Sequence, residues 1–585
     1  MSTLRILIAA GLTLFASPAF AAPADDLHAI ENDYWSFVLR ENPVLATRAG
    51  VHDYDTQIPD ISLAAEARRA TEQKGFLKRL EEIAPDALSE ADEVDRAILR
   101  RTLADAIEAN AFPQRVMLFT SYDGWHQDFA GMGEDLPFRT LADYRNYLTR
   151  IAQYPRLNDE ALRITEKAVQ GGFVLPCSAL GGYEKTISGV ISADPTRSRF
   201  YKPFLNDKPG DATDSAWRAE KADAARIITT VINPAYAKHL DFYLHRYLPH
   251  CSKTDSISAQ PEGALYYAFR VRQETTTGLT PDQIHSLGLA EVKRILAEMD
   301  ELAAKSGYAS RQAMIADLRT NPAYYPRTAE ELLADAALTA KMIEAKLPQY
   351  FGRLPRLPFG IRPIPPETAE GTTTAYYGEG SVESGLSGTY YVNTSKLGQR
   401  PLWELPALTA HESVPGHHLQ IALQQELDLP PWRRFGTGFT AFVEGWALYA
   451  ERLGIPMGIY DTPAKEMGRL SYEMWRACRL VVDTGIHSRG WTKAQAVQFM
   501  TDNTALSAAN IDAEVNRYIS WPGQALGYKI GQLKILELRD RAEKLLGPRF
   551  DLRHFHDAVL SGGPVPLDVL EGEIDRWIAR EKATG

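Results

Sequence analysis

Apolar residues recur every three or four positions along most of the chain, which is the spacing of helices with one buried face. In the N-terminal part this pattern predicts helices over 25–42, 62–83, 88–110, 141–170 with a break at Tyr154-Pro155, 213–247, 280–305 and 328–346. In the C-terminal part it predicts helices over 401–427, 439–453, 464–487, 492–503, 507–519, 524–544 and 565–581. Pro406 is expected to start or kink the first helix of the second group.

The pattern changes between these two groups. Residues 354–367 contain five prolines and cannot be helical throughout. Runs rich in β-branched and aromatic residues follow at 372–377 and 388–393, separated by a glycine-rich stretch, and predict a β-hairpin. The hairpin either packs against the helices or offers an edge to an extended peptide, in which case Tyr390 and Tyr391 are candidate substrate contacts. The predicted fold class is therefore mostly α, with a minor β-hairpin.

A dense group of potential metal ligands lies in the second helical part. His411, His417 and His418 are three of the chain's 13 histidines, and Glu412 stands beside the first of them. Glu444 follows in a segment that is apolar on nearly every side, where an unpaired carboxylate would be unfavourable without a cation. Two imidazoles and a carboxylate hold catalytic zinc, while a further glutamate moves protons. The alternative is a structural cluster of hydrogen-bonded histidines with Glu412 as a solvated charge.

The spacing of the histidines does not suit a straight helix. His417 would point about 120° away from His411, and His418 would share its face but lie roughly 10 Å along the axis. Zinc bonds of about 2 Å cannot span either arrangement. Pro415 lacks the N–H that a continuous helix needs, and Gly416 tolerates unusual backbone angles. We therefore predict a bulge of one or two residues that brings a downstream histidine back over His411.

The segments 411–418 and 444–449 resemble the bacterial domain-of-unknown-function family 885. The Gly-His step, the Leu-Gln and Asp-Leu-Pro that follow it, and the later glutamate also resemble angiotensin-converting enzyme and the thimet and Taq-carboxypeptidase metallopeptidases. Those proteins carry His-Glu-x-Gly-His, and this chain has two more residues before Gly-His. The resemblance, which covers most of residues 250–585, implies a large two-lobed helical metallopeptidase. It favours His417 as the second ligand, with His418 as the alternative.

The resemblance implies one Zn²⁺ per chain, held by His411, His417 and Glu444, with Glu412 as general base and acid in the hydrolysis of short peptides. Arg517-Tyr518 is similar to the Arg-Tyr step of angiotensin-converting enzyme, but the histidine expected ten residues earlier is Ala508. The residue that stabilises the transition state therefore stays open between Tyr518 and Tyr528, and His487 is a candidate for the missing histidine. Other readings are a zinc amidohydrolase acting on a non-peptide amide and a non-catalytic zinc or peptide-binding protein.

A peptide substrate with a free carboxylate would need a fixed cation. Arg517, Lys529 and Arg479 are candidates for it, and the sequence does not choose among them.

The N-terminus has the features of a secretory signal peptide. Arg5 precedes an apolar run from Ile6 to Phe15, and Ala19-Phe20-Ala21 forms a cleavage site. We expect residues 1–21 to be removed and the protein to be secreted or periplasmic, without stable membrane insertion. The chain length suggests two closely packed lobes, a scaffold over 22–275 and a catalytic lobe over 276–585.

Charge and cysteine content narrow the possible partners and compartment. The formal net charge of −11 disfavours nucleic acid as a partner, and the oligomeric state stays open. Of the three cysteines, Cys177 and Cys251 stand in turn-like Leu-Pro contexts, whereas Cys478 lies in an apolar helical run. We predict a Cys177–Cys251 disulfide, as suits an oxidising compartment, and a buried thiol at Cys478.

Overall fold

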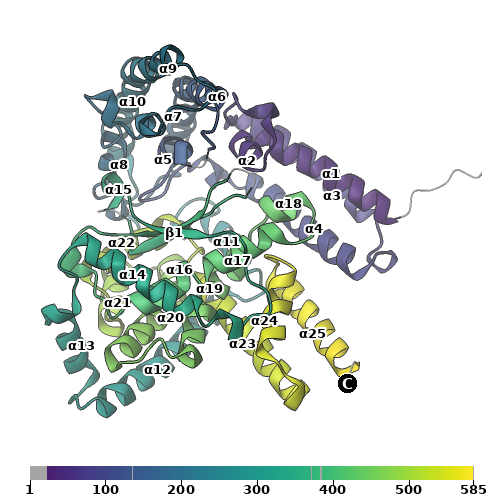
Figure 1. Ribbon diagram of the computed structural model, residues 1–585, viewed down its shortest axis with the longest axis vertical. Coiled ribbons are helices and arrows are strands. Elements are labelled where there is room, and N and C mark those ends of the chain that lie inside the picture. The colour runs from purple at the N-terminus through teal and green to yellow at the C-terminus, as the bar shows by residue number, and fades with distance from the viewer. Residues whose placement is uncertain (1–22, 135, 370–371, 383–384, 584–585) are drawn as a thin grey trace, which may run out of the picture.

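The computed structural model describes residues 23–134, 136–369, 372–382 and 385–583. The predicted signal peptide, 1–21, lies outside them. Within the described residues the chain is mostly helical and carries one small sheet, so the predicted fold class is confirmed (Figure 1). No helix in this part of the chain has the length and apolar character needed to cross a membrane.

The N-terminal part folds into helices close to the predicted ones. They are α1 (Pro23–Glu41), α2 (Pro43–Arg48), α3 (Leu63–Glu81), α4 (Glu90–Ala111), α5 (Trp125–Gly131), α6 (Leu141–Ile151), α7 (Tyr154–Gly171), α8 (Glu184–Ser188), α9 (Asp214–Ile227), α10 (Asn233–Phe242) and α11 (Gly263–Thr275). The predicted break is confirmed, because α7 restarts with Pro155 in its first turn, where a missing N–H is harmless. The predicted helix over 213–247 comprises α9 and α10 with π-helical turns at Ile228–Ile232 and Tyr243–Tyr247.

The C-terminal part contains all the predicted helices and several short ones that the pattern missed. They are α12 (Pro281–Lys305), α13 (Arg311–Thr320), α14 (Ala329–Glu344), α15 (Pro366–Ala369), α16 (Leu405–Glu412), α17 (His417–Glu426), α18 (Pro431–Phe435), α19 (Thr440–Met457), α20 (Pro463–Arg489), α21 (Lys493–Asn503), α22 (Ala508–Ser520), α23 (Leu526–Leu546), α24 (Leu552–Ser561) and α25 (Leu567–Ala583). Helix α20 is buried from Met467 to His487, which makes it the central helix of this part.

The sheet has three strands in the order β1 (Phe359–Pro363), β3 (Gly388–Val392) and β2 (Ala375–Gly378). Strands β2 and β3 pair antiparallel, which confirms the predicted hairpin. Strand β1, in the proline-rich stretch, was not predicted; it pairs parallel to β3 at the edge of the sheet, where prolines are tolerated. Tyr390 and Tyr391 therefore lie on the central strand, and the outer edge on the hairpin side belongs to β2.

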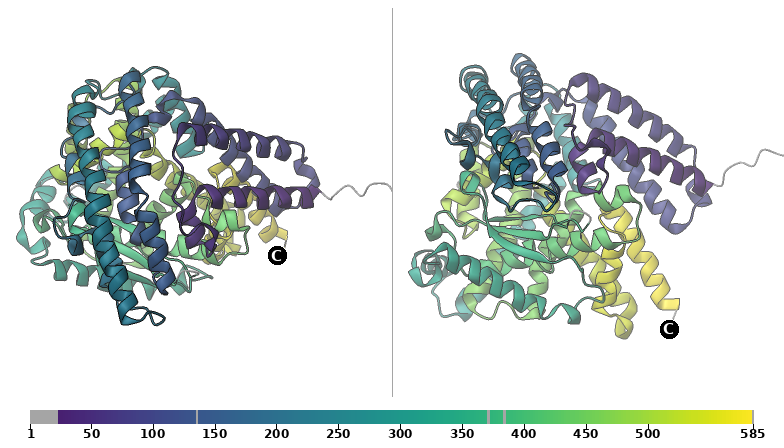
Figure 2. Two further views of the ribbon diagram at one scale, coloured as in Figure 1. Left: turned by 90° about the horizontal axis from the view of Figure 1, so that it is seen from above. Right: turned by 45° about the horizontal axis from the view of Figure 1, so that its top comes forward.

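Four groups of buried apolar side chains hold the described helices together, and the smallest consists of Val116, Ile164 and Ala168. One joins α1, α3 and α4 to α19, α23 and α25, the second lies within α5–α10, and the third surrounds α12, α20 and α22. Figure 2 shows the purple N-terminal helices on the same side of the molecule as the yellow C-terminal ones. The division into lobes after residue 275 stays a prediction.

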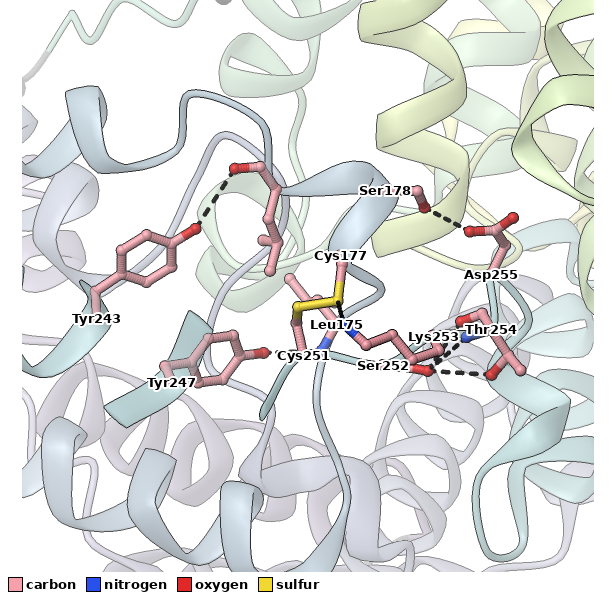
Figure 3. The surroundings of a disulfide bond; sticks show 11 residues. Leu175, Cys177, Ser178, Tyr243, Tyr247, Cys251, Ser252, Lys253, Thr254 and Asp255 are labelled. Carbon is pink, nitrogen blue, oxygen red and sulfur yellow. Dashed lines mark hydrogen bonds between the residues drawn. A yellow bond between two sulfur atoms is a disulfide. The ribbon is translucent and has the colours of Figure 1, made fainter. Parts of the chain in front are cut away.

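The predicted disulfide is present. Cys177, the first residue of the short helix over Cys177–Ala179, bonds to Cys251 across 74 positions of sequence, and Figure 3 shows this bond beside Tyr247. The backbone N–H of Cys177 donates to Ser252 O at 2.9 Å, so the two segments are also tied by the main chain. Cys478 is a buried free thiol, as predicted. Such a bond is typical of proteins that fold outside the reducing cytoplasm.

Candidate metal centre

The helix that carries His411 breaks at Pro415. Helix α16 ends at Glu412, α17 begins at His417, and the Val414–Pro415 peptide bond between them is cis. The predicted interruption is confirmed, but its form is different: four residues, 413–416, leave the helix completely instead of making a bulge of one or two. Over these four residues the chain changes direction, and it then starts a second helix.

Close backbone packing holds this break in place. A Cβ on Gly416 would lie 1.9 Å from His411 O, so only glycine fits. The Trp446 indole N–H of α19 donates to Pro415 O at 2.8 Å, and the Ser413 hydroxyl donates to Thr409 O at 2.6 Å. The break is thereby fixed to the helix that carries Glu444.

The break brings His411 and His417 to the same carboxylate. Glu444 Oε2 lies 3.4 Å from His411 Nε2 and 3.3 Å from His417 Nε2. The two imidazole rings are nearly perpendicular, at 89°, with centroids 4.8 Å apart. Both histidines are buried and Glu444 is half-buried, and the three candidate ligand atoms lie within 4.8 Å of one another.

The geometry of this cluster is compatible with a metal ion. Ligands bound at about 2.0–2.1 Å to a tetrahedral zinc ion lie about 3.3 Å from one another. The two separations from Glu444 Oε2 match this value, and all three candidate ligand atoms lie within 4.8 Å of one another. Glu444 Oε2 is buried and, among the described residues, has no hydrogen-bond partner of acceptable geometry. A buried carboxylate oxygen needs a compensating group, and a cation between the three side chains would supply it.

Charges within the cluster shift its protonation when no metal is bound. Burial disfavours the charged form of Glu444, but His417 and His411 outweigh it and hold the pKa of this carboxyl well below its usual range. Burial also opposes charge on His411, yet the neighbouring carboxylates of Glu444 and Glu451 raise the pKa of its imidazole to about 9.

A second carboxylate orients His411. Glu451 lies seven residues after Glu444 on α19, and its Oε1 accepts a hydrogen bond from His411 Nδ1–H at 2.8 Å. This bond turns Nε2, the nitrogen that would hold a metal ion, toward Glu444. Arg476 Nη2 of α20 lies 3.0 Å from the same Glu451 oxygen and fixes it. Sequence reasoning missed both residues, although the spacing of Glu444 and Glu451 places them on one helix face.

His418 points away from this cluster. Its Nδ1 lies 2.9 Å from the Tyr377 hydroxyl of β2, and the ring packs against Phe359 of β1. Burial, partly offset by a backbone hydrogen bond with Leu357, lowers the pKa of His418 to about 4. The structure therefore brings His417 to His411 and Glu444, and it uses His418 to fasten α17 to the sheet.

A cleft of about 850 Å³ opens over the cluster. His411, His417, Glu444 and Glu412 all line it, and so does the stretch from Thr372 to Glu379 that includes β2. The opposite wall is formed by N-terminal residues, among them Tyr122, Asp123, Gln127 and Asp128. The N-terminal part thus contributes to the lining of the cleft, and two of these four residues are acidic.

Tyr528 and Arg517 are further predicted site residues that reach the cleft. The Tyr528 ring lies parallel to that of His411, with centroids 6.3 Å apart and an interplanar angle of 10°. Arg517 Nη2 donates to the Tyr528 hydroxyl at 3.0 Å. Burial raises the pKa of Tyr528 despite Arg517 nearby, so the phenol stays protonated and can donate a hydrogen bond. Tyr391 also lines the cleft, whereas Tyr390 is fully buried, with its hydroxyl 3.4 Å from that of Thr409.

The structure does not bring Tyr518 and His487 to the metal cluster. The Tyr518 hydroxyl accepts from Trp475 and Arg479 and donates to Glu514, which uses its full bonding capacity. His487 Nδ1 accepts from the backbone N–H of Ile257, and its Nε2 donates to Tyr518 O. Both residues are fully buried and hold helices together. The sequence did not reveal this structural role, because only the folded chain shows which groups form hydrogen bonds with the two side chains.

A comparison with protein families identifies the family of this sequence. The sequence profile described as "Bacterial protein of unknown function (DUF885)" matches residues 43–574. The chain belongs to the DUF885 family. This confirms the family resemblance expected from the residues around His411 and Glu444. No curated protein matches this DUF885 chain.

Two solved structures are similar to this DUF885 chain. One is a "putative lipoprotein" from Colwellia psychrerythraea, with 28% identity, a TM-score of 0.88, and coverage of 96% of this chain and 100% of that one. The other is a "putative lipoprotein of unknown function" from Shewanella oneidensis, with 19% identity, a TM-score of 0.66, and coverage of 93% and 99%. The second likeness concerns the fold alone.

Proposed function

We propose that this protein is a zinc-dependent hydrolase that cleaves peptide bonds. The observation that carries the proposal is the position of Glu444 Oε2, buried without a hydrogen-bond partner between two imidazole nitrogens at the separations of zinc ligands. His411, His417 and Glu444 would hold the ion. When bound, zinc acts as a Lewis acid that acidifies water and polarises a carbonyl group.

Glu412 is the proposed general base and acid. It follows His411 directly, lines the cleft with the three ligands and contributes no atom to the ligand group. A free carboxylate there can accept a proton from the attacking water and deliver it to the leaving nitrogen. A purely structural zinc site has four protein ligands and no use for such a residue.

Tyr528 is the proposed donor to the carbonyl oxygen. Charge develops on that oxygen as water adds, and a fixed hydroxyl donor then stabilises the transition state more than the substrate. The raised pKa of Tyr528 keeps its proton available, and Arg517 holds its oxygen in place. Its ring stacks with that of a proposed zinc ligand, so the donor and the ligands share one wall of the cleft.

Short peptides in an extracytoplasmic compartment are the proposed substrates. The disulfide and the signal-peptide features of the first 21 residues, which lie outside the described part, support export. The cleft, of about 850 Å³, is lined by residues of both the N-terminal and the C-terminal part, and a cleft of this size suits chain ends and short peptides better than folded proteins.

Metal analysis combined with digestion of a peptide library tests the proposal. We expect about one zinc per chain in the wild type and in Glu412→Gln, and a loss of cleavage of roughly 10²–10⁴-fold in that variant. Glu220→Gln is the matched control, because this buried glutamate pairs with Arg145 in the N-terminal part and does not line the cleft. Equal cleavage by wild type and Glu412→Gln, or a wild type without zinc after growth in ample zinc, would refute the mechanism.

A further inference from the structure

Two arginines stand at the cleft beside the proposed zinc ligands with part of their bonding capacity unused. Arg479 and Arg517 both line the cleft, and their side chains are 2% and 13% exposed. Arg479 Nη1 and Arg517 Nε are buried and have no hydrogen-bond partner among the described residues. A buried donor that makes no hydrogen bond is energetically costly, so the site is incomplete without an acceptor.

The charges at this place do not balance. Glu514 is the acidic partner of both arginines: it lies 2.8 Å from Arg479 Nη2 and 3.7 Å from Arg517 Nη1. Two guanidinium groups thus share one carboxylate, which leaves one positive charge in excess. Arg476, the next guanidinium on the same wall, is already paired with Glu451 and belongs to the support of His411. A single anionic group would complete the pair formed by Arg479 and Arg517.

The two arginines are held rigidly. The Arg479 guanidinium carbon lies 4.1 Å from the centroid of Tyr528 and 4.7 Å from that of Trp475. Its Nε donates to Tyr518 at 3.1 Å, and Arg517 Nη2 donates to Gln524 at 2.7 Å. A guanidinium group that is held in a fixed plane can donate two parallel hydrogen bonds to one carboxylate. Lys529, the third cation expected from the sequence, is fully buried against Glu291 and Glu473 and does not line the cleft.

We infer that Arg479 and Arg517 bind the free C-terminal carboxylate of the peptide, which makes the protein a carboxy-terminal exopeptidase. The inference rests on the peptide hydrolysis proposed above and names its substrate class. Ring contacts of 6.3 Å and 4.1 Å link His411 to Tyr528 and Tyr528 to Arg479. The ligand ring and the guanidinium are therefore no farther apart than about 10 Å, the length of three extended residues. Cleavage is expected within the last three residues of the substrate.

Binding to the zinc-loaded Glu412→Gln protein tests the subsite without catalysis. The probes are N-acetylated pentaalanine with a free carboxylate, its C-terminal amide, and the amide with glutamate as last residue. We expect the free acid to bind at least about tenfold more tightly than either amide, since a charge-assisted pair is lost in both. Equal affinity of acid and amide would overturn the inference. Equal affinity of the free acid and the glutamate-containing amide would assign the subsite to side-chain carboxylates and overturn it as well.

Cleavage by the wild-type protein separates this inference from the proposed function. Release of fragments of one to three residues from the free acid, with slow turnover of the amide, supports both. Equal turnover of acid and amide, or cuts far from the C-terminus, overturns the carboxylate subsite and leaves the peptidase proposal standing. Acid-selective binding without any cleavage keeps the subsite and refutes the peptidase.

Substitution at the charge pair gives a further readout. Arg479→Gln leaves Arg517 balanced by Glu514, so the acid preference should fall to less than about threefold. Arg433→Gln is the matched control, because this buried arginine pairs with Asp95 and does not line the cleft, and it should retain the wild-type preference. A preference unchanged in Arg479→Gln would overturn the assignment. If that variant does not fold, the comparison of acid and amide in the wild-type chain still decides.

Discussion

The contact between Glu451 and His411 offers a direct test of the metal centre. Glu451→Gln keeps the shape of the side chain and an oxygen that can accept from His411 Nδ1–H, now 2.8 Å away. The substitution removes the negative charge of Glu451, which makes the His411 imidazole a stronger metal ligand. It also removes the charge that pairs with Arg476 at 3.0 Å.

The expected effect follows from the place of Glu451 behind the ligand. Loss of such a partner typically lowers metal affinity by about 10–100-fold, which corresponds to about 1.4–2.7 kcal/mol. Because glutamine still accepts the hydrogen bond, we expect a value near the lower end, about tenfold. Glu451→Ala would also leave Arg476 buried and unpaired, at a cost of about 3–5 kcal/mol in folding free energy, which would obscure the metal term.

Zinc affinity is measured by competition with a chromophoric chelator at constant pH, and thermal unfolding is followed with and without zinc. Asp95→Asn is the matched control, because Asp95 is a buried carboxylate bonded to Arg433 and takes no part in the metal cluster. It should lower stability and leave zinc affinity unchanged. A Glu451→Gln protein that binds zinc as tightly as the wild type would show that Glu451 does not tune His411 and would refute the reasoning.

Three further predictions concern the same region. His417→Ala should abolish zinc retention, whereas His418→Ala should retain zinc and lose stability, since His418 joins α17 to the sheet; zinc loss only in His418→Ala would reverse the assignment. Gly416→Ala should strongly destabilise the fold in chemical denaturation, because its Cβ would meet His411 O at 1.9 Å, whereas Gly398→Ala, with open space around it, should be nearly neutral. The pKa of His411 in the metal-free protein is raised from 6.5 to about 9, so its protonation adds stability that is complete below pH 6.5 and is lost as pH rises through about 9. Because zinc must displace that proton, its affinity should rise with pH up to about 9, and a flat profile in chelator competition from pH 6.5 to 9 would contradict the pKa shift.

The helical periodicity of the sequence determined most of the fold. An amphipathic stripe repeats locally, so the long helices were predicted within a few residues of their ends. Strand β1 was not predicted because its five residues, Phe359–Pro363, stand among prolines and form a strand only by pairing with β3. Short helices such as α15 and α18 carry too few turns to show a period.

The sequence also determined which types of residue meet at the site. The tertiary structure decided which individual residues of those types lie there. His411, Glu412, Gly416 and Glu444 were found because few ligands occur so close together in an apolar context. The choice between His417 and His418 depended on the direction in which the chain leaves the break after Glu412. That direction is set by long-range contacts, such as the bond from Trp446 to Pro415, which no local pattern records.

The same holds for the groups around the ligands. Tyr518 and His487 have the chemistry of catalytic residues, but their partners from distant segments use that chemistry for packing. Glu451 and Arg476 look like ordinary helix charges in the sequence and acquire their roles only from the residues that face them. Sequence fixes local propensity and chemical type, whereas burial and the partners of each polar group are properties of the folded chain.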